Sequence, residues 1–133
     1  MPAYAQRHLT VVILLASVAA CGSSPLQISA IQLGRTLNAD QSVAEFDTVF
    51  SPKEPIHLSV LTTGGGSGTI GVRWMYRGSL IGESTKSVAN RDFAATNFPL
   101  QTTGGFPPGE YSAEVFLDGK PVGTKTFKVQ VGR

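Results

Sequence analysis

Cysteine, histidine and charge are scarce in this sequence, and each scarcity excludes a class of chemistry. The 133 residues contain one cysteine, two histidines and 15% charged residues. One cysteine cannot form a disulfide within the chain, and so few imidazole and thiol groups cannot build a zinc site or a histidine-based nucleophile relay. We therefore expect no catalytic residue, no metal site and no cofactor, and we predict that the protein is not an enzyme.

A run of basic residues is also absent. Lys and Arg number 11 and Asp and Glu number 9, which gives a formal net charge of +2. The two signs alternate along the chain, so the sequence has no evident source of steering toward a phosphate backbone. We expect no nucleic-acid partner.

The apolar run near the start of the chain is too short to span a membrane. It extends from Leu9 to Ala20, whereas a transmembrane helix needs about 20 apolar residues. It follows a polar start that contains Arg7 and ends in small residues, which is the pattern of a secretory signal peptide. We assign residues 1–20 to this signal and exclude them from the fold.

The end of this signal, "VAAC" at residues 18–21, resembles the lipobox of bacterial lipoproteins. The resemblance implies that the Cys21 thiol carries diacylglycerol, that the chain is cut just before it, and that residues 21–25 link the lipid to the folded domain. It also implies a membrane as partner, and Gly22 in place of aspartate favours the outer membrane of a Gram-negative cell envelope. In the alternative interpretation, an ordinary signal is cleaved near Ala20 and Cys21 is a free thiol.

Short segments of alternating polarity make up the rest of the chain. The 15 glycines and 8 prolines favour tight turns between these segments, and no stretch of helical period lies among them. We therefore predict a single all-β domain over residues 26–133 with about seven strands. The expected strands are Leu26–Leu33, Ile56–Leu61, Thr69–Arg77, Ser79–Glu83, Phe93–Leu100, Tyr111–Leu117 and Thr124–Val131.

The alternation also predicts which side chains form the core. In "TIGVRWMYR", residues 69–77, every second side chain is large and apolar, as expected for a strand with one buried face. The same reasoning applies to the last two strands. The predicted core residues are Ile70, Val72, Trp74 and Tyr76, then Tyr111, Ala113, Val115 and Leu117, and finally Phe127, Val129 and Val131.

The turn between the last two strands can be tested against this core. A two-residue turn at Asp118-Gly119 would pair Tyr111 with Thr126 and would point polar side chains inward. A three-residue loop, or a bulge at Gly123, shifts the pairing so that Tyr111 opposes Phe127. We predict the second register.

The segment "PPGEYSA", residues 107–113, resembles the tyrosine corner of immunoglobulin-like domains. The resemblance implies a single antiparallel immunoglobulin-like β-sandwich, in which the Tyr111 hydroxyl bonds to backbone just upstream. Because the chain has no cysteine pair, no disulfide can join the two sheets. We expect apolar packing to hold them together, around Trp74, Phe98, Tyr111 and Phe127.

Other patterns carry weaker signals. "GSGTIG", residues 66–71, matches the dinucleotide fingerprint, but a strand follows it where that motif requires a helix. "GGFPPG", residues 104–109, has the spacing of a phosphate-binding loop, but Glu110 stands where a lysine is required. We expect both to be turns or loops. The remaining candidates are expected to be ordinary surface groups: His57, Glu45 and Asp47.

One predicted face has the composition of a contact surface, because it sets a phenylalanine and a methionine among charges. It collects Arg73, Met75, Arg77, Glu114 and Phe116. The alternative is simple cross-strand pairing, in which an arginine covers Phe116 and opposes Glu114.

Two functions follow from these patterns. The first is an envelope lipoprotein that acts as a non-catalytic protein-interaction or accessory module toward an envelope protein. The alternative is a carbohydrate- or peptidoglycan-binding module that uses the loops "TTGGGSG" and "TTGGFPPG", with Phe106 stacking on the ligand. The sequence leaves the oligomeric state open.

Overall fold

The structure is a computed structural model that describes residues 25–90 and 92–132. The predictions for residues 1–20 and for Cys21 lie outside these residues. The described chain is all β, and none of it forms a helix that could cross a membrane. Its strands are β1 (Gln27–Leu37), β2 (Val43–Phe46), β3 (Val49–Phe50), β4 (Ile56–Thr63), β5 (Gly66–Tyr76), β6 (Ser79–Asn90), β7 (Ala94–Leu100), β8 (Gly109–Leu117) and β9 (Lys120–Val129).

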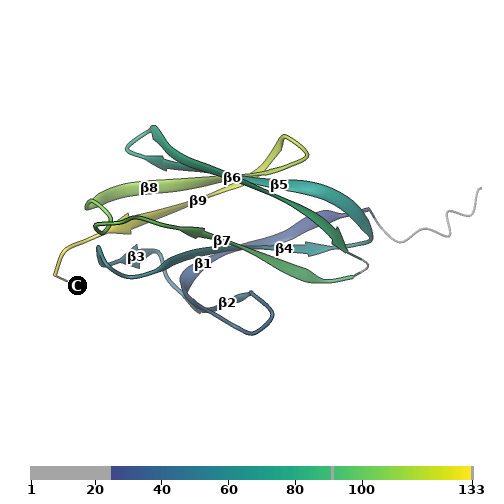
Figure 1. The fold of residues 1–133 in the computed structure, drawn as a ribbon, viewed down its shortest axis with the longest axis horizontal. Coiled ribbons are helices and arrows are strands. Elements are labelled where there is room, and N and C mark those ends of the chain that lie inside the picture. Colours follow the sequence, from purple (N-terminus) through teal and green to yellow (C-terminus); the bar gives the residue numbers. More distant parts are fainter. Residues whose placement is uncertain (1–24, 91, 133) are drawn as a thin grey trace, which may run out of the picture.

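The strands form two sheets that pack face to face as a β-sandwich (Figure 1). One sheet has the order β2-β1-β4-β7 and the other has the order β3-β9-β8-β5-β6. All strand pairs are antiparallel except β3 with β9, which is parallel. The predicted sandwich is therefore confirmed, with one parallel pair that the sequence analysis did not anticipate.

All seven expected strands are present, and the differences concern short or polar segments. The strands β2 and β3 were not expected, because four and two residues are too short to show an alternation. The strand β6 continues to Asn90, beyond its expected end at Glu83. Its second half lies at the edge of a sheet and is mostly polar, with only Val88 packed against the core, so it lacks the regular alternation that marks a half-buried strand.

The core contains most of the side chains that the alternation predicted, but Tyr76 and Leu117 are only partly buried against it, and Val131 lies outside it. Ile70, Val72 and Trp74 of β5 are buried, and so are Tyr111, Ala113, Val115, Phe127 and Val129. Val131 was expected in the core but is 74% exposed. The strand β9 ends at Val129, so Val131 has no sheet to hold it over the core.

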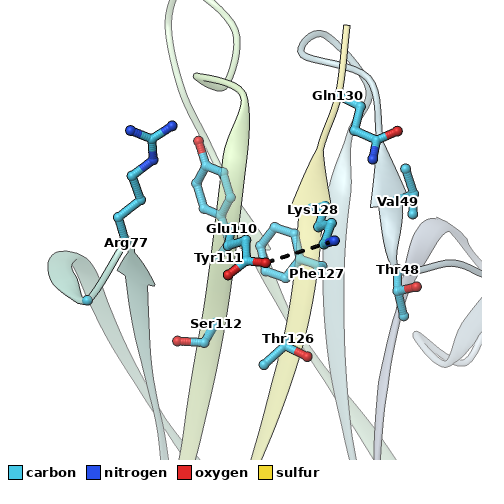
Figure 2. Close-up of a pocket in the computed structure, with 11 residues that line it drawn as sticks. Thr48, Val49, Arg77, Glu110, Tyr111, Ser112, Thr126, Phe127, Lys128 and Gln130 are labelled. Carbon is cyan, nitrogen blue, oxygen red and sulfur yellow. Dashed lines mark ion pairs between the residues drawn. The ribbon is translucent and has the colours of Figure 1, made fainter.

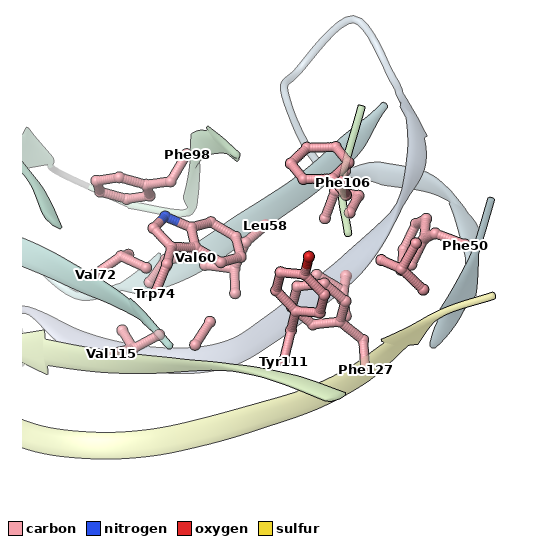
Figure 3. Packing of buried hydrophobic residues seen from close by; sticks show 14 of the residues in the cluster. Phe50, Leu58, Val60, Val72, Trp74, Phe98, Phe106, Tyr111, Val115 and Phe127 are labelled. Atoms are coloured by element: carbon pink, nitrogen blue, oxygen red, sulfur yellow. The ribbon is translucent and has the colours of Figure 1, made fainter. Parts of the chain in front are cut away.

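Aromatic rings supply much of the core (Figure 3). The ring of Phe127 contacts three other aromatic rings. It stacks on the ring of Tyr111, with 5.1 Å between centroids. It meets the rings of Phe50 and Trp74 edge-on, at centroid distances of 5.7 and 6.1 Å. Burying one such side chain stabilises a fold by about 1.5–3 kcal/mol. Apolar packing therefore joins the two sheets, as expected for a chain that cannot form a disulfide.

The predicted tyrosine corner is present. The Tyr111 hydroxyl donates a hydrogen bond to the Pro107 carbonyl oxygen at 2.6 Å, and burial raises the pKa of this hydroxyl. The bond fixes the loop before β8 to the start of that strand. It therefore helps to hold the first residues of β8 in position at this end of the sheet.

The β8–β9 hairpin has the predicted register and shows how it arises. Asp118 and Gly119 both have positive φ, of 51° and 80°, and form a two-residue turn that pairs Leu117 with Lys120. A register shift follows after Phe116, so that Tyr111 opposes Phe127. The extra residue is Val122, which is 45% exposed. A bulge next to Gly123, and not a three-residue loop, therefore produces the predicted register.

Part of the outer face of the four-stranded sheet is covered by the segment 38–43, which leads into the edge strand β2. The Ser59 hydroxyl points out of β4, yet it is fully buried and donates to the Gln41 carbonyl oxygen at 2.6 Å. The Val43 N–H donates to Gln32 Oε1 on β1 at 2.9 Å. A Cβ on Gly34 would lie 1.9 Å from a backbone oxygen of β2, so only glycine allows this approach.

The sandwich has two different ends (Figure 1). Pro25 bridges to Gly65 at one end, where the β8–β9 turn also lies, because the Asp118 N–H donates to the Thr69 carbonyl oxygen. The opposite end carries the β5–β6 turn and two longer loops, residues 51–55 and 101–108. We call these the N-terminal end and the loop end.

Candidate interaction face

The outer face of the five-stranded sheet gathers the predicted contact residues, and we call it the open face. Arg73 is exposed, whereas Met75, Glu114 and Phe116 are partly exposed. They lie side by side because β5 and β8 are neighbours, with Arg73 directly opposite Glu114 and Gly71 directly opposite Phe116. Arg77 lies just beyond β5 in the turn, and its N–H donates to the Glu110 carbonyl oxygen at 3.1 Å.

The cross-strand pairing on this face differs in part from the expected one. Arg73 opposes Glu114 in the register, as anticipated, but its Nε forms an ion pair with Glu83 of β6 at 3.0 Å. Both side chains are about half exposed, and such surface pairs contribute only about 0–1 kcal/mol. Glu83 therefore belongs to the face, although sequence reasoning missed it because the face was predicted without the strand Ser79–Glu83.

A hollow lies over Gly71 in the middle of the open face, and we call it the Gly71 hollow. Its volume is about 280 Å³ and its wall includes Phe116, Thr85, Arg73 and Glu83. A Cβ on Gly71 would meet Thr85 Cγ2 at 3.6 Å and Phe116 Cβ at 3.8 Å, which are ordinary contacts. The fold therefore does not require glycine here. A glycine inside a strand often marks a place where another molecule approaches closely.

A second, larger hollow lies on the same face near the loop end (Figure 2). Its volume is about 700 Å³. The exposed ion pair between Lys128 Nζ and Glu110 Oε1, at 3.9 Å, crosses it. The polar side chains around it include Thr48, Arg77, Ser112, Thr126 and Gln130, and apolar groups such as Val49 also line it. The open face thus continues from the Gly71 hollow to the edge strand β3.

The expected ligand site on the glycine-rich loops is wrong. Phe106 is only 7% exposed and packs edge-on against Tyr111 at 6.4 Å, and its N–H donates to the Pro52 carbonyl oxygen at 2.7 Å. It belongs to the core, so its ring cannot stack on a ligand. Moreover, residues 62–68 turn at the N-terminal end, whereas residues 101–108 lie at the loop end. The two loops cannot share one site.

His57 was expected to be an ordinary surface residue but is only partly exposed. It lines a hollow of about 790 Å³ at the loop end. The prolines Pro52, Pro55 and Pro99 contribute to this hollow. The Nδ1 atom of His57 is buried without a hydrogen-bond partner. In the described residues, no three His, Cys, Asp or Glu side chains lie where they could share a metal ion.

Asp47, expected to be a solvated acid, belongs to a cluster around Arg35. The Arg35 guanidinium pairs with the Asp47 carboxylate at 2.8 Å and with Glu54 of loop 51–55. The pKa of Asp47 is lowered, chiefly because the Val49 N–H donates to it. The hydrogen bond from Arg35 lowers the pKa of Glu54. This cluster ties β1 to Asp47, just before β3, and to the loop 51–55 that follows β3. It is structural, and Glu45 stays exposed on β2.

The two packed sheets and the tyrosine corner define an immunoglobulin-like β-sandwich, and solved structures support this class. The chain is similar to an immunoglobulin-like protein from Pseudomonas aeruginosa, with 14% identity over 80% of this chain and 98% of that chain and a TM-score of 0.55. It is also similar to an alkylpurine DNA glycosylase from Pseudomonas fluorescens, with 14% identity, 80% coverage of this chain and a TM-score of 0.53.

These likenesses establish the fold alone. The chain spans 30% of the glycosylase's length, so the likeness concerns one part of that protein. No protein-family model matches the sequence, and no curated protein is detectably similar to it. The function must therefore be argued from the surface of this sandwich.

Proposed function

We propose that this protein is a lipid-anchored envelope lipoprotein whose sandwich is a non-catalytic protein-interaction module. The open face is the contact surface. The observation that carries this proposal is the contrast between the two outer faces, because the chain's own segment 38–43 covers part of one, whereas the other leaves a phenylalanine and a methionine partly exposed among charges. Apolar anchors inside a polar rim are the composition of protein contact sites.

The position of the open face fits a tethered module. If Cys21 carries the lipid, the linker to Pro25 reaches no more than about 15 Å, so the N-terminal end of the sandwich stays near the membrane. The strands of the open face run away from that end (Figure 1). A partner in the same membrane, or one just above it, could therefore pack along the whole face.

Photo-crosslinking in intact cells tests this function. The full chain carries a photoreactive residue at position 116 in one strain and at Thr36 in another, since Thr36 is exposed on the opposite sheet. We expect a discrete adduct from position 116 and none from position 36. If neither position gives an adduct while the protein is abundant and membrane-bound, the open face is not a contact surface.

The anchor has its own test. Cys21→Ser should move the protein from the membrane fraction to the soluble fraction of the same cells, because two or more acyl chains are needed for stable anchoring and none can be attached. A protein that remains in the membrane fraction after this substitution would contradict the lipoprotein assignment without affecting the proposed contact face.

A further inference from the structure

We propose that the partner of the open face is a second copy of this chain. The two copies pack face to face about a two-fold axis that runs parallel to the strands, midway between β5 and β8. This inference rests on the proposed function, because it names the partner of the same face. It follows from the register of β5 with β8, which makes the face complementary to itself.

Charge is divided between these two strands. At the positions that face outward, β5 carries Arg73, whereas β8 carries Glu114 and Glu110. Arg77 lies in the turn after β5 with a φ of 48°, and its guanidinium lies over the Tyr76 ring at 5.3 Å from the centroid. Each basic residue lies directly beside an acidic one, since Arg73 opposes Glu114 in the register and the Arg77 N–H bonds to the Glu110 carbonyl oxygen. One strand of the pair is therefore basic and its neighbour is acidic.

A half-turn about the proposed axis exchanges β5 and β8 and keeps every residue at the same height along the strands. Arg73 of each copy then lies over Glu114 of the other, and the turn that carries Arg77 lies at the height of Glu110. A two-fold interface requires this property, because any contact made by one copy is made in reverse by the other. Opposite charges across an interface set its register and select the partner.

The shape of the open face is also complementary to itself under this rotation. Gly71 and Phe116 are directly opposite each other on β5 and β8, so the rotation places Phe116 of one copy over the Gly71 hollow of the other. The three atoms nearest to the missing Cβ of Gly71 are Thr85 Cγ2, Phe116 Cβ and the Ser84 carbonyl oxygen, at 3.6 to 4.0 Å, so no atom of the Phe116 ring is among them. The volume of about 280 Å³ accommodates one aromatic side chain.

The strands on either side of this pair, β9 and β6, bring no like charges together. The exchange also places β9 over β6, and the register carries Thr124 to the height of Glu83 and Thr126 to that of Leu80. No two like charges of the described face are brought together. The four strands that face each other, at about 4.8 Å each, and nine residues of β8, at about 3.3 Å each, cover about 570 Å² on each copy. The pair therefore buries about 1,140 Å² in total, which is above the roughly 1,000 Å² expected of a specific interface, although a standard interface buries about 800 Å² per partner.

Charge reversal on this face gives a test that a merely unstable variant cannot imitate. Two differently tagged forms of the full chain are co-expressed, solubilised in a mild detergent and purified through one tag, and recovery of the other form is measured. We expect recovery from the unchanged pair. Arg73→Glu in both forms places carboxylates against Glu114 of the other copy, and Glu114→Arg in both forms places guanidinium groups against Arg73. Each should reduce recovery about tenfold or more.

The decisive sample combines the two variants, one in each form. Every contact then pairs opposite charges again, so recovery should return to within about twofold of the unchanged pair. Glu45→Arg, on the exposed part of β2, serves as the matched control and should leave recovery unchanged. If the mixed sample stays as low as the single variants, or if the unchanged forms do not co-purify, the two-fold pairing is wrong.

The adduct formed at position 116 separates this inference from the proposed function. An adduct of twice the mass of the chain is expected if the second copy is the partner. An adduct of another mass would overturn the inference and leave the contact face in place, with a different envelope protein as its partner. Absence of any adduct would overturn both.

Discussion

The two outer faces of the sandwich have the same backbone architecture but opposite surroundings. On the four-stranded sheet, Ser59 points outward and is fully buried beneath segment 38–43. On the five-stranded sheet, the outward-facing Thr126 is exposed. The difference teaches that the chain covers part of one face with its own segment and leaves side chains at the middle of the other exposed. A face that a fold leaves unfinished, and that carries apolar side chains, is the natural place to look for a partner.

The glycines of the two faces give the largest expected contrast. A Cβ at Gly34 would lie 1.9 Å from the Glu45 backbone oxygen and 2.4 Å from Val43 Cγ1, so Gly34→Ala must displace β2 and should lower the free energy of unfolding by about 2–4 kcal/mol. Gly71→Ala meets only ordinary contacts and should change it by less than about 1 kcal/mol, with a gain expected from strand propensity. Thermal unfolding of the two variants measures both values.

Equal destabilisation by the two alanines would break the comparison, because it would mean that the open face is as closely packed as the covered one. A neutral Gly34→Ala would show that β2 does not lie against β1 in the way the structure places it.

Hydroxyl groups give the second contrast. Ser59→Ala removes a buried hydrogen bond and leaves the Gln41 carbonyl oxygen without its partner, so we expect a loss of about 1–2 kcal/mol. Thr126→Ala removes an exposed hydroxyl from β9 and should cost less than about 0.5 kcal/mol. Chemical denaturation of both variants measures the difference. The assignment of segment 38–43 as a cover fails if the two losses are the same.

Acid sensitivity gives the smallest contrast. The pKa values of Asp47 and Glu54 are lowered in the folded protein, so their contribution to stability is full above the ordinary values, 3.8 and 4.5, and is lost as the pH falls through the folded values. Arg35→Gln removes the main cause of the Glu54 shift and a lesser cause of the Asp47 shift. It should therefore make the loss of stability below about pH 4.5 shallower.

The matched substitution is Arg73→Gln on the open face, where the ion pair with Glu83 is about half exposed. It should leave the slope of stability against pH unchanged, because an exposed pair contributes little. Melting temperatures at several pH values between 3 and 7 compare the two variants. A larger change of slope for Arg73→Gln than for Arg35→Gln would contradict the structural role given to the Arg35 cluster.

The sequence by itself determined the features that depend on neighbours along the chain. Alternation in β5, β8 and β9 predicted their buried faces, and the wrong core that a plain Asp-Gly turn would produce predicted the shifted register of the hairpin. The tyrosine corner was visible in seven consecutive residues. These predictions succeeded because side-chain direction in a strand repeats every two residues and needs no knowledge of the partner strand.

The tertiary structure alone decided which surfaces are free. Phe106 sits in a loop rich in glycine and proline that gives no sign of burial, yet Pro52 holds its backbone and Tyr111 packs on its ring. Segment 38–43 shows no pattern that marks it as a cover. The pairing of Gly71 with Phe116 joins segments far apart in the chain. Such contacts depend on which strands become neighbours in the sheets, and the local alternation of polarity does not encode that arrangement.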